Sequence, residues 1–168
     1  GKLNVVDFIG SYFTFFQTQQ APFDDARVRE AFSLVIDRNY IIEMISQSGE
    51  VPATGLVPSG IFDKEGSKGD DFRTVGGDYY SVASEDYEAN CTRARELLTQ
   101  AGYPDGAGLP KVEYYYYTSD FQQAVGEALQ NMLKTELGVD VILVNQDWGV
   151  FFTSIMEGNF NIASSSFG

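Results

Sequence analysis

The residues that could perform acid, base or nucleophilic chemistry are few and poorly grouped. The chain has no histidine, so no Ser-His or Cys-His pair can activate a nucleophile. Its only cysteine, Cys91, falls on the apolar stripe of a predicted helix and is interpreted as a buried structural thiol. Adjacent carboxylates open predicted helices or lie in loops, where capping and solvation explain them: Asp24 with Asp25, Asp70 with Asp71, and Glu85 with Asp86. We therefore expect that the protein is not an enzyme.

The sequence predicts neither a metal site nor a cofactor. A single cysteine and the lack of histidine exclude a structural zinc cluster. Asp63, Glu65 and Ser67 have the spacing that begins a calcium loop. However, Lys68 stands where such a loop needs glycine, and Thr74 stands where it needs a bidentate glutamate. No glycine cluster has the spacing of a phosphate-binding or dinucleotide-binding loop, so phosphate binding is not supported either.

Aromatic and small polar residues at the ends of predicted strands are the remaining candidates. From residue 112 onward the sequence predicts strand, helix, strand, helix, strand, which is the pattern of right-handed βαβ crossovers. The predicted strands cover 112–117, 139–144 and 160–167, and the apolar run of the second is typical of the centre of a parallel sheet. Ligands of such sheets bind beyond the carboxyl ends of the strands. Those ends are Thr118–Gln122, Asn145–Trp148 and Ser164–Gly168.

Two predicted elements precede this unit. Residues 3–19 are rich in aromatic residues and suggest one or two strands divided near Gly10. Aromatics on both sides favour a strand that is covered on both faces over an aromatic ligand platform. A long amphipathic helix is predicted over 21–46, with Asp24 or Asp25 as its N-cap.

The domain organisation is that of one α/β domain spanning residues 1–168. Residues 49–83 are rich in glycine and proline and predict an extended loop region. Residues 84–168 hold a helix followed by the βαβαβ unit. The chain begins at Gly1 rather than Met and stops just after an apolar segment, so we interpret it as a piece of a longer protein.

Composition excludes several classes of partner. The hydrophobic content of 43% and charged content of 21% are those of a folded soluble domain. With 24 acidic and 11 basic residues the net charge is −13, which repels nucleic acid and anionic lipid. No segment approaches the roughly 18 apolar residues of a membrane span. We expect no nucleic-acid partner and no direct membrane insertion.

Several motifs resemble the extracytoplasmic solute-binding proteins, family 5 type, that serve oligopeptide and dipeptide ABC transporters. The resemblance covers nearly the whole chain in the right order. It implies one lobe, most of the C-terminal one, of a type II periplasmic-binding-protein-like fold in a two-lobed protein. The matching segments are Pro22-Phe23-Asp24-Asp25, Arg27-Val28-Arg29, Ile36-Asp37-Arg38, Pro52-Ala53, Pro58, Ala101-Gly102-Tyr103, Tyr117-Thr118-Ser119-Asp120, Leu143-Val144-Asn145-Gln146-Asp147-Trp148 and Gly158-Asn159-Phe160.

This resemblance implies specific ligand contacts. In the oligopeptide binders the strand before the first helix, the turn after the aromatic strand, a tryptophan and the last strand approach the bound peptide. The matching positions in this chain are Tyr12, Phe13, Phe15, Ser119, Gln122, Trp148, Ser164 and Phe167. The family aspartate that binds the ligand amine would follow just past Gly168.

The chain departs from the family pattern at the residues that meet peptide charges. Where family members place a glutamate, a histidine and arginines, this chain has Phe15, Gln122, Ile155 and Ser164. The departure favours a more neutral or apolar ligand, or one held mostly through its backbone. Relatives of this architecture also carry nickel complexes, sugars, haem or antibiotics, so a non-peptide ligand is the alternative and a hydrolase a remote one.

The resemblance also implies partners and a location. The ligand would be a peptide or another small solute, delivered by the full-length protein to the membrane permease subunits of an ABC transporter. The protein would act outside the cytoplasm, as a cell-surface lipoprotein or in the periplasm.

Overall fold

The computed structural model describes residues 8–64 and 69–167 as a sheet with helices on both faces. The predicted strand positions 3–7 and part of the rejected calcium segment lie outside the described residues. In chain order the elements are β1 (Ser11–Phe16), α1 (Ala26–Leu34), α2 (Arg38–Ile41), η1 (Ile42–Ser46), α3 (Phe72–Gly76), η2 (Ser84–Asp86), α4 (Tyr87–Gln100), η3 (Pro104–Gly106), β2 (Val112–Tyr117), α5 (Asp120–Leu137), β3 (Val141–Gln146), α6 (Trp148–Met156) and β4 (Ile162–Phe167).

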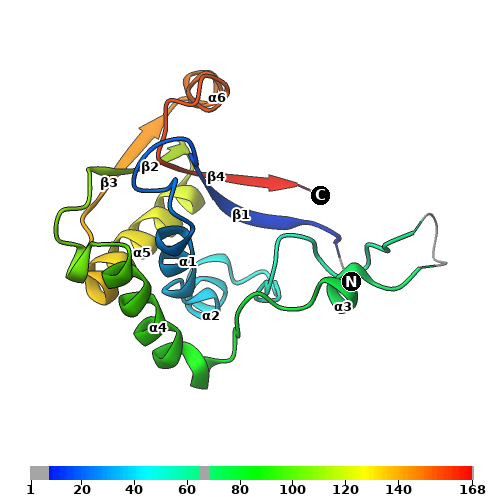
Figure 1. Cartoon of the computed structure of the whole chain (residues 1–168). Helices are drawn as coiled ribbons and strands as arrows, with labels where there is room; N and C mark the ends of the chain where they lie inside the picture. Colours follow the sequence, from blue (N-terminus) through cyan, green and yellow to red (C-terminus); the bar gives the residue numbers. More distant parts are fainter. Residues whose placement is uncertain (1–7, 65–68, 168) are drawn as a thin grey trace.

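The strands form one four-stranded sheet in the order β1-β4-β2-β3 (Figure 1). Strand β2 runs parallel to both β3 and β4, whereas β1 runs antiparallel to β4. Right-handed crossovers lead from β2 to β3 in one direction across the sheet and from β3 to β4 in the other, which places α5 and α6 on opposite faces. The predicted α/β architecture with a mostly parallel sheet is confirmed.

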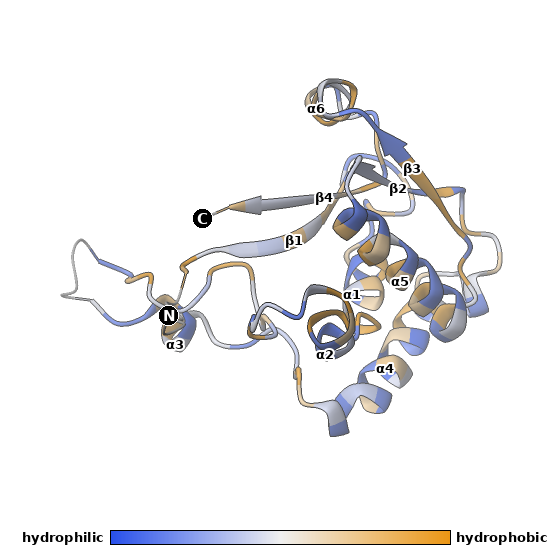
Figure 2. Ribbon diagram, turned by 180° about the vertical axis from the view of Figure 1, so that it is seen from behind, coloured by the Kyte–Doolittle hydropathy of each residue, from blue (hydrophilic) through white to orange (hydrophobic). Residues whose placement is uncertain are grey.

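The hydrophobic core lies between the sheet and the helices of one face. Helices α1, α2, α4 and α5 gather on this face, while α6 stands apart on the other (Figures 1 and 2). Val112 and Tyr114 of β2 are buried against this helix layer together with Val125 of α5. Phe32 of α1 and Cys91 of α4 extend the same core, and the prediction that Cys91 is a buried thiol is confirmed.

Strand β1 is covered on one face only. Phe16 packs against Phe23 and Phe32, with ring centroids 4.9 and 6.3 Å away. Phe13 and Phe15 point to the opposite face and are half-buried. The expectation that β1 is covered on both faces is therefore wrong for its second face, because no helix of the described residues packs there over β1.

The prediction of a single long helix over 21–46 is also wrong. Helix α1 ends at Leu34, and a new helix begins at Arg38 with Asp37 as its N-cap. The Asp37 carboxylate accepts a hydrogen bond from the Tyr40 N–H at 3.0 Å. A short side chain that satisfies a free helical N–H stabilises a helix start, so Asp37 divides an otherwise continuous apolar pattern.

Two other regions differ from a regular layered domain. The described residues 49–64 and 69–83 hold the short helix α3 and a bridge between Phe62 and Asp71, and they extend sideways beyond β1 and β4 (Figure 1). Strand β3, predicted at the sheet centre, lies at its edge among the described strands. Its apolar run has another cause: Leu143 packs into the core beneath α5, whereas Ile142 is 45% exposed on the opposite face.

None of the described helices combines the length and apolar composition needed to cross a membrane. Within residues 8–64 and 69–167, no three histidine, cysteine, aspartate or glutamate side chains are grouped as they would be around a metal ion.

Candidate functional site

The face of the sheet opposite α1, α4 and α5 is the candidate site, and we call it the open face. Strand register places Phe13 and Phe15 of β1 on this face beside Phe167 of β4, because directly paired residues of neighbouring strands point the same way. The register of β2 with β4 adds Tyr115 and Tyr117. Of the described helices, only α6 lies over this face (Figure 1).

Four phenylalanines make one aromatic cluster on the open face. Phe13 lies between Phe15 and Phe167, with ring centroids 6.2 and 5.9 Å away. Phe15 meets Phe160 edge to face at 5.1 Å. These distances are those of favourable aromatic pairs, so the rings support one another and form a continuous apolar surface along β1 and β4.

A second aromatic cluster joins the end of β2 to the first turns of α6. The Tyr117 ring lies 5.1 Å from Trp148 and 5.8 Å from Phe151, and Trp148 lies 6.4 Å from Phe152. Phe151 is buried and fixes the helix to the sheet, whereas Trp148 is 62% exposed. Trp148, which the family resemblance gives as a ligand contact, thus lies at the surface, and its role with a ligand stays a prediction.

Two of the predicted ligand contacts lie inside the protein instead of on a surface. Gln122 in the first turn of α5 and Ser164 of β4 are 3% and 1% exposed. The Tyr12 hydroxyl donates a hydrogen bond to Gln122 Oε1 at 2.8 Å. Among the described residues, the buried Tyr114 hydroxyl and Ser164 Oγ have no hydrogen-bond partner. Gln122 thus holds the Tyr12 hydroxyl, Ser164 is buried beside the core, and the contact of either residue with a ligand stays a prediction.

Burial raises the pKa of Tyr12 and, further, that of Tyr114. Both phenols therefore remain protonated at neutral pH, and the Tyr12 hydroxyl acts as a neutral hydrogen-bond donor. The Tyr12 ring, which meets Phe121 edge to face at 5.4 Å, keeps one side at the surface near the start of α5.

Polar groups line the carboxyl edge of β2 and β3. Ser119 occupies the N-cap position of α5 and is partly exposed, without a capping hydrogen bond from its side chain. Thr118 Oγ1 donates to Asn145 Oδ1 at 2.6 Å, which ties the ends of the two strands together. Asp120 and Asp147, one after each strand, are exposed. The edge thus offers hydroxyl, amide and carboxylate groups next to the aromatic face.

Sequence reasoning missed several members of this surface. Phe152 and Met156 continue outward from Trp148 at a spacing of four residues, and Phe160 and Tyr117 complete the two aromatic clusters. The four-residue spacing was visible in the sequence, but it is equally typical of a helix side turned to the core. Only the placement of α6 on the open face shows that this side of the helix is exposed and not turned to the core.

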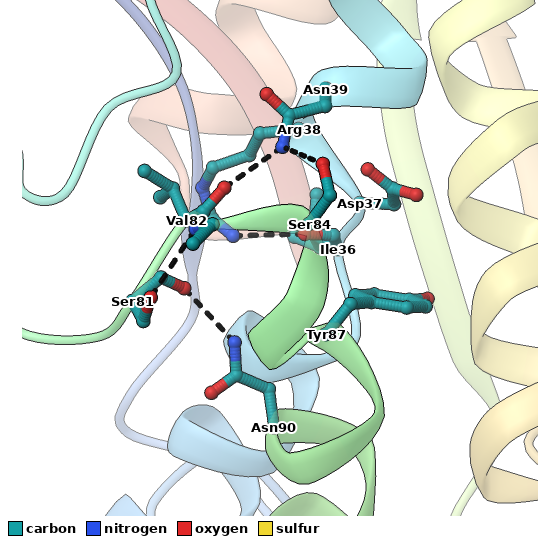
Figure 3. Close-up of a pocket in the computed structure, with 10 residues that line it drawn as sticks. Ile36, Asp37, Arg38, Asn39, Ser81, Val82, Ser84, Tyr87 and Asn90 are labelled. Atoms are coloured by element: carbon teal, nitrogen blue, oxygen red, sulfur yellow. Dashed lines mark hydrogen bonds between the residues drawn. The ribbon is translucent and has the colours of Figure 1, made fainter.

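The small cavity between α2, α4 and residues 81–84 is a structural niche and not a ligand site (Figure 3). Its volume of about 20 Å³ holds one water molecule at most. The Arg38 guanidinium lies 4.1 Å from the Tyr80 ring centroid and donates to the carbonyls of Ser33 and Ile36 at 3.2 and 3.0 Å. These contacts of Arg38 stabilise the turn between the end of α1 and the start of α2.

The fold and the open face together define a lobe of the periplasmic-binding-protein type, with an aromatic surface beside the carboxyl edge of a mostly parallel sheet. Residues 3–168 match the family described as bacterial extracellular solute-binding proteins, family 5 (middle), and the chain belongs to this family.

Two relatives show how much of a full-length protein this chain represents. It is 32% identical over 167 residues to the dipeptide-binding protein DppE of Bacillus subtilis, which covers 99% of this chain and 29% of DppE. It is 34% identical over 160 residues to the periplasmic murein peptide-binding protein MppA of Escherichia coli, which covers 94% of this chain and 27% of MppA. A solved structure of MppA matches with a TM-score of 0.76 at 35% identity, over 95% of this chain and 29% of that structure. The chain thus spans less than a third of the length of these relatives.

Proposed function

We propose that this chain forms one half of the ligand cleft of an extracellular solute-binding protein that captures peptides for import by an ABC transporter. The complete protein closes two lobes over its ligand by a hinge motion and delivers it to membrane permease subunits. It acts outside the cytoplasm, either in the periplasm or as a cell-surface lipoprotein. It binds its ligand without catalysing a reaction.

The observation that carries this proposal is the open face itself. It presents two aromatic clusters and the polar carboxyl edge on a rigid sheet. Aromatic walls with a few placed hydrogen-bonding groups are the usual lining of a binding site for small ligands. The names of DppE and MppA, which describe binding of dipeptides and of murein peptides, support a peptide as the ligand.

The predicted contacts divide into two groups under this proposal. Phe13, Phe15, Trp148 and Phe167 line the cleft directly, together with the Tyr12 ring and Ser119 at its rim. Gln122 acts through Tyr12, because its side-chain oxygen accepts the hydrogen bond of the Tyr12 hydroxyl, and Ser164 is buried in β4. The ligand is held by apolar contact and by hydrogen bonds to its backbone.

Mass spectrometry of ligands that copurify with the full-length protein tests the proposal. Denaturation of the purified protein releases its ligand into the soluble fraction. This fraction is compared with that from a mock purification. We expect masses and fragment ions of short peptides, enriched over the mock sample. Stoichiometric recovery of a nickel complex, a sugar, haem or an antibiotic would contradict the peptide assignment while leaving the fold assignment intact.

A further inference from the structure

The described residues 49–64 and 69–83 form an arm that extends sideways beyond β1 and β4 (Figures 1 and 2). Ordered loop segments of this length in a compact domain usually have a function. Large apolar side chains on the arm and at the start of β1 are 37–72% exposed, where a folded domain normally buries such groups. We call six of them the arm patch: Ile9, Leu56, Ile61, Phe62, Val75 and Tyr79.

Hydrogen bonds position the arm although it has little regular structure. The Phe72 N–H donates to the Ile61 carbonyl at 2.8 Å, which joins the two sides of the arm at the start of α3. The Ser11 hydroxyl donates to the Leu56 carbonyl at 2.8 Å, which ties the arm to β1. The arm patch is therefore positioned before a partner binds, and this lowers the entropic cost of binding.

Arg73 of α3 carries a charge that the arm leaves unpaired. Its guanidinium carbon lies 5.8 Å from the ring centroids of both Phe72 and Tyr79. The guanidinium also occupies the position that a Cβ on Gly55 would take. Its three nitrogens are buried, and no described residue accepts a hydrogen bond from them. Because a buried cation without an acceptor is costly, this contact indicates an arm that is completed by a partner.

The charges around the arm patch favour a partner with basic side chains. Among the described arm residues, Lys64 is the one exposed lysine or arginine. Opposite charges pair across complementary surfaces, whereas anionic lipid and nucleic acid would be repelled. Four exposed carboxylates lie on the arm: Glu50, Asp63, Asp70 and Asp78.

The rest of the full-length protein is the partner that these observations favour. This chain covers 29% of DppE and 27% of MppA, so most of the length of such a protein lies outside it. Ser11 at the start of β1 pairs with Phe167 at the end of β4, so chain that continues past either strand end starts near the arm (Figure 1). A bound peptide fits less well, because the arm lies beyond the open face and not on it.

We propose that the arm patch docks against the rest of the full-length chain, on a surface with an apolar centre and basic side chains around it. This inference rests on the proposed function, in which a second lobe is present. It adds a contact outside the ligand cleft that fixes the arm to the remainder of the protein. Because this contact does not involve the ligand, it is present with and without bound peptide.

Hydroxyl-radical footprinting of the full-length protein tests the docking. Tyr79 is 72% exposed in this chain, so without a partner its native oxidation rate should nearly equal its rate in urea. We expect the native rate to be at least about tenfold lower than that in urea, with and without added Ala-Phe-Ala, because the centre of an interface excludes water. Tyr40, which is 47% exposed on α2, is the matched control and should keep a native rate close to its rate in urea.

Val75→Asp in the full-length protein is a second test, because it places a charge in the proposed interface. We expect the melting temperature to fall by about 3 °C or more, since the new carboxylate would be taken out of water without a partner. Met44→Asp is the matched control. Met44 is 61% exposed on η1, so this variant should melt within about 1 °C of the wild type.

Three outcomes would overturn the inference. Oxidation of native Tyr79 at nearly its rate in urea would contradict the docking while leaving the peptide function in place. Protection that appears only with added peptide would assign the arm to the ligand cleft. Protection that is lost on dilution, together with a dimer mass by light scattering, would assign the arm patch to a second copy. Absence of peptide binding with Tyr79 still protected would contradict the proposed function and support the docking.

Discussion

Single carboxylates decide where several helices of this chain begin. Asp25, Asp37 and Asp71 each occupy an N-cap position and accept a backbone N–H within the next three residues, at 2.8, 3.0 and 2.8 Å. A helix start at Asp24 or Asp25 was predictable, because Pro22 and Phe23 end the preceding segment, and the structure selects Asp25. The role of Asp37 was not, because the apolar spacing continues on both sides of it and an aspartate on the polar side of one helix has the same pattern.

Cys91 provides a residue-level prediction that depends on pH. Burial raises the pKa of the Cys91 thiol to about 11, and the side chain has no exposed surface. At pH 8 only roughly one molecule in a thousand carries the thiolate, so alkylation by iodoacetamide should be at least about a hundredfold slower in the native chain than in urea. The native rate should rise steadily between pH 8 and pH 10. Native labelling as fast as that in urea would contradict the buried position.

The raised pKa of the Cys91 thiol also makes the stability of the fold depend on pH. The folded-state pKa of Cys91 lies above the value of 9.0 expected for the unfolded chain. Its contribution to stability is therefore complete below about pH 9 and is lost as the pH rises toward 11, since only the unfolded chain then ionises readily.

At the scale of elements, glycine turns end two helices of the layer that covers the core, α4 and α5. Gly138 ends α5 with a φ of +69°, and its neighbour across the turn is the carbonyl of Asp105. Gly102 follows α4 with a φ of +97° but has open space where a Cβ would lie. Both glycines were recognisable as helix ends from the sequence, whereas the close approach at Gly138 depends on tertiary packing.

These two glycines form a matched pair of tests. Gly102→Ala should lower the free energy of unfolding by about 1 kcal/mol, because alanine resists a positive φ. Gly138→Ala should lower it by about 1–3 kcal/mol more, since its Cβ would also collide with the Asp105 carbonyl oxygen. Urea unfolding of both variants measures the difference. Equal losses in the two variants would contradict the close packing of the α5 turn against η3.

At this scale, the placement of α6 is the feature that the sequence did not predict. The order strand, helix, strand, helix, strand follows from the periodicity after residue 112, and right-handed crossovers follow from that order. Which strands are neighbours does not follow, and β3 was expected at the centre of the sheet instead of its edge. The neighbour order places α6 on the open face. There Trp148, Phe152 and Met156 are exposed, although their spacing is equally typical of a helix side that faces the core.

On the scale of the whole molecule, the chain is a folded lobe in which a layer of helices covers one face of the sheet and leaves most of the other face uncovered. Its helix layer encloses a continuous core, and its open face presents aromatic clusters and the polar carboxyl edge. The fold and the family were predictable from the sequence. The division of the predicted contacts into exposed and buried residues was not, because Gln122 and Ser164 look no different from surface polar residues in the sequence.

The central claim is that this lobe forms half of a peptide cleft that closes in a longer protein. Isothermal titration of Ala-Phe-Ala into the full-length protein and, separately, into the 168-residue chain tests it most directly. We predict saturable binding by the full-length protein and affinity at least about a hundredfold weaker for the isolated chain, because half of the contacts to the ligand are lost. Equal affinity for both proteins, or no binding by either across a panel of short peptides, would contradict the account.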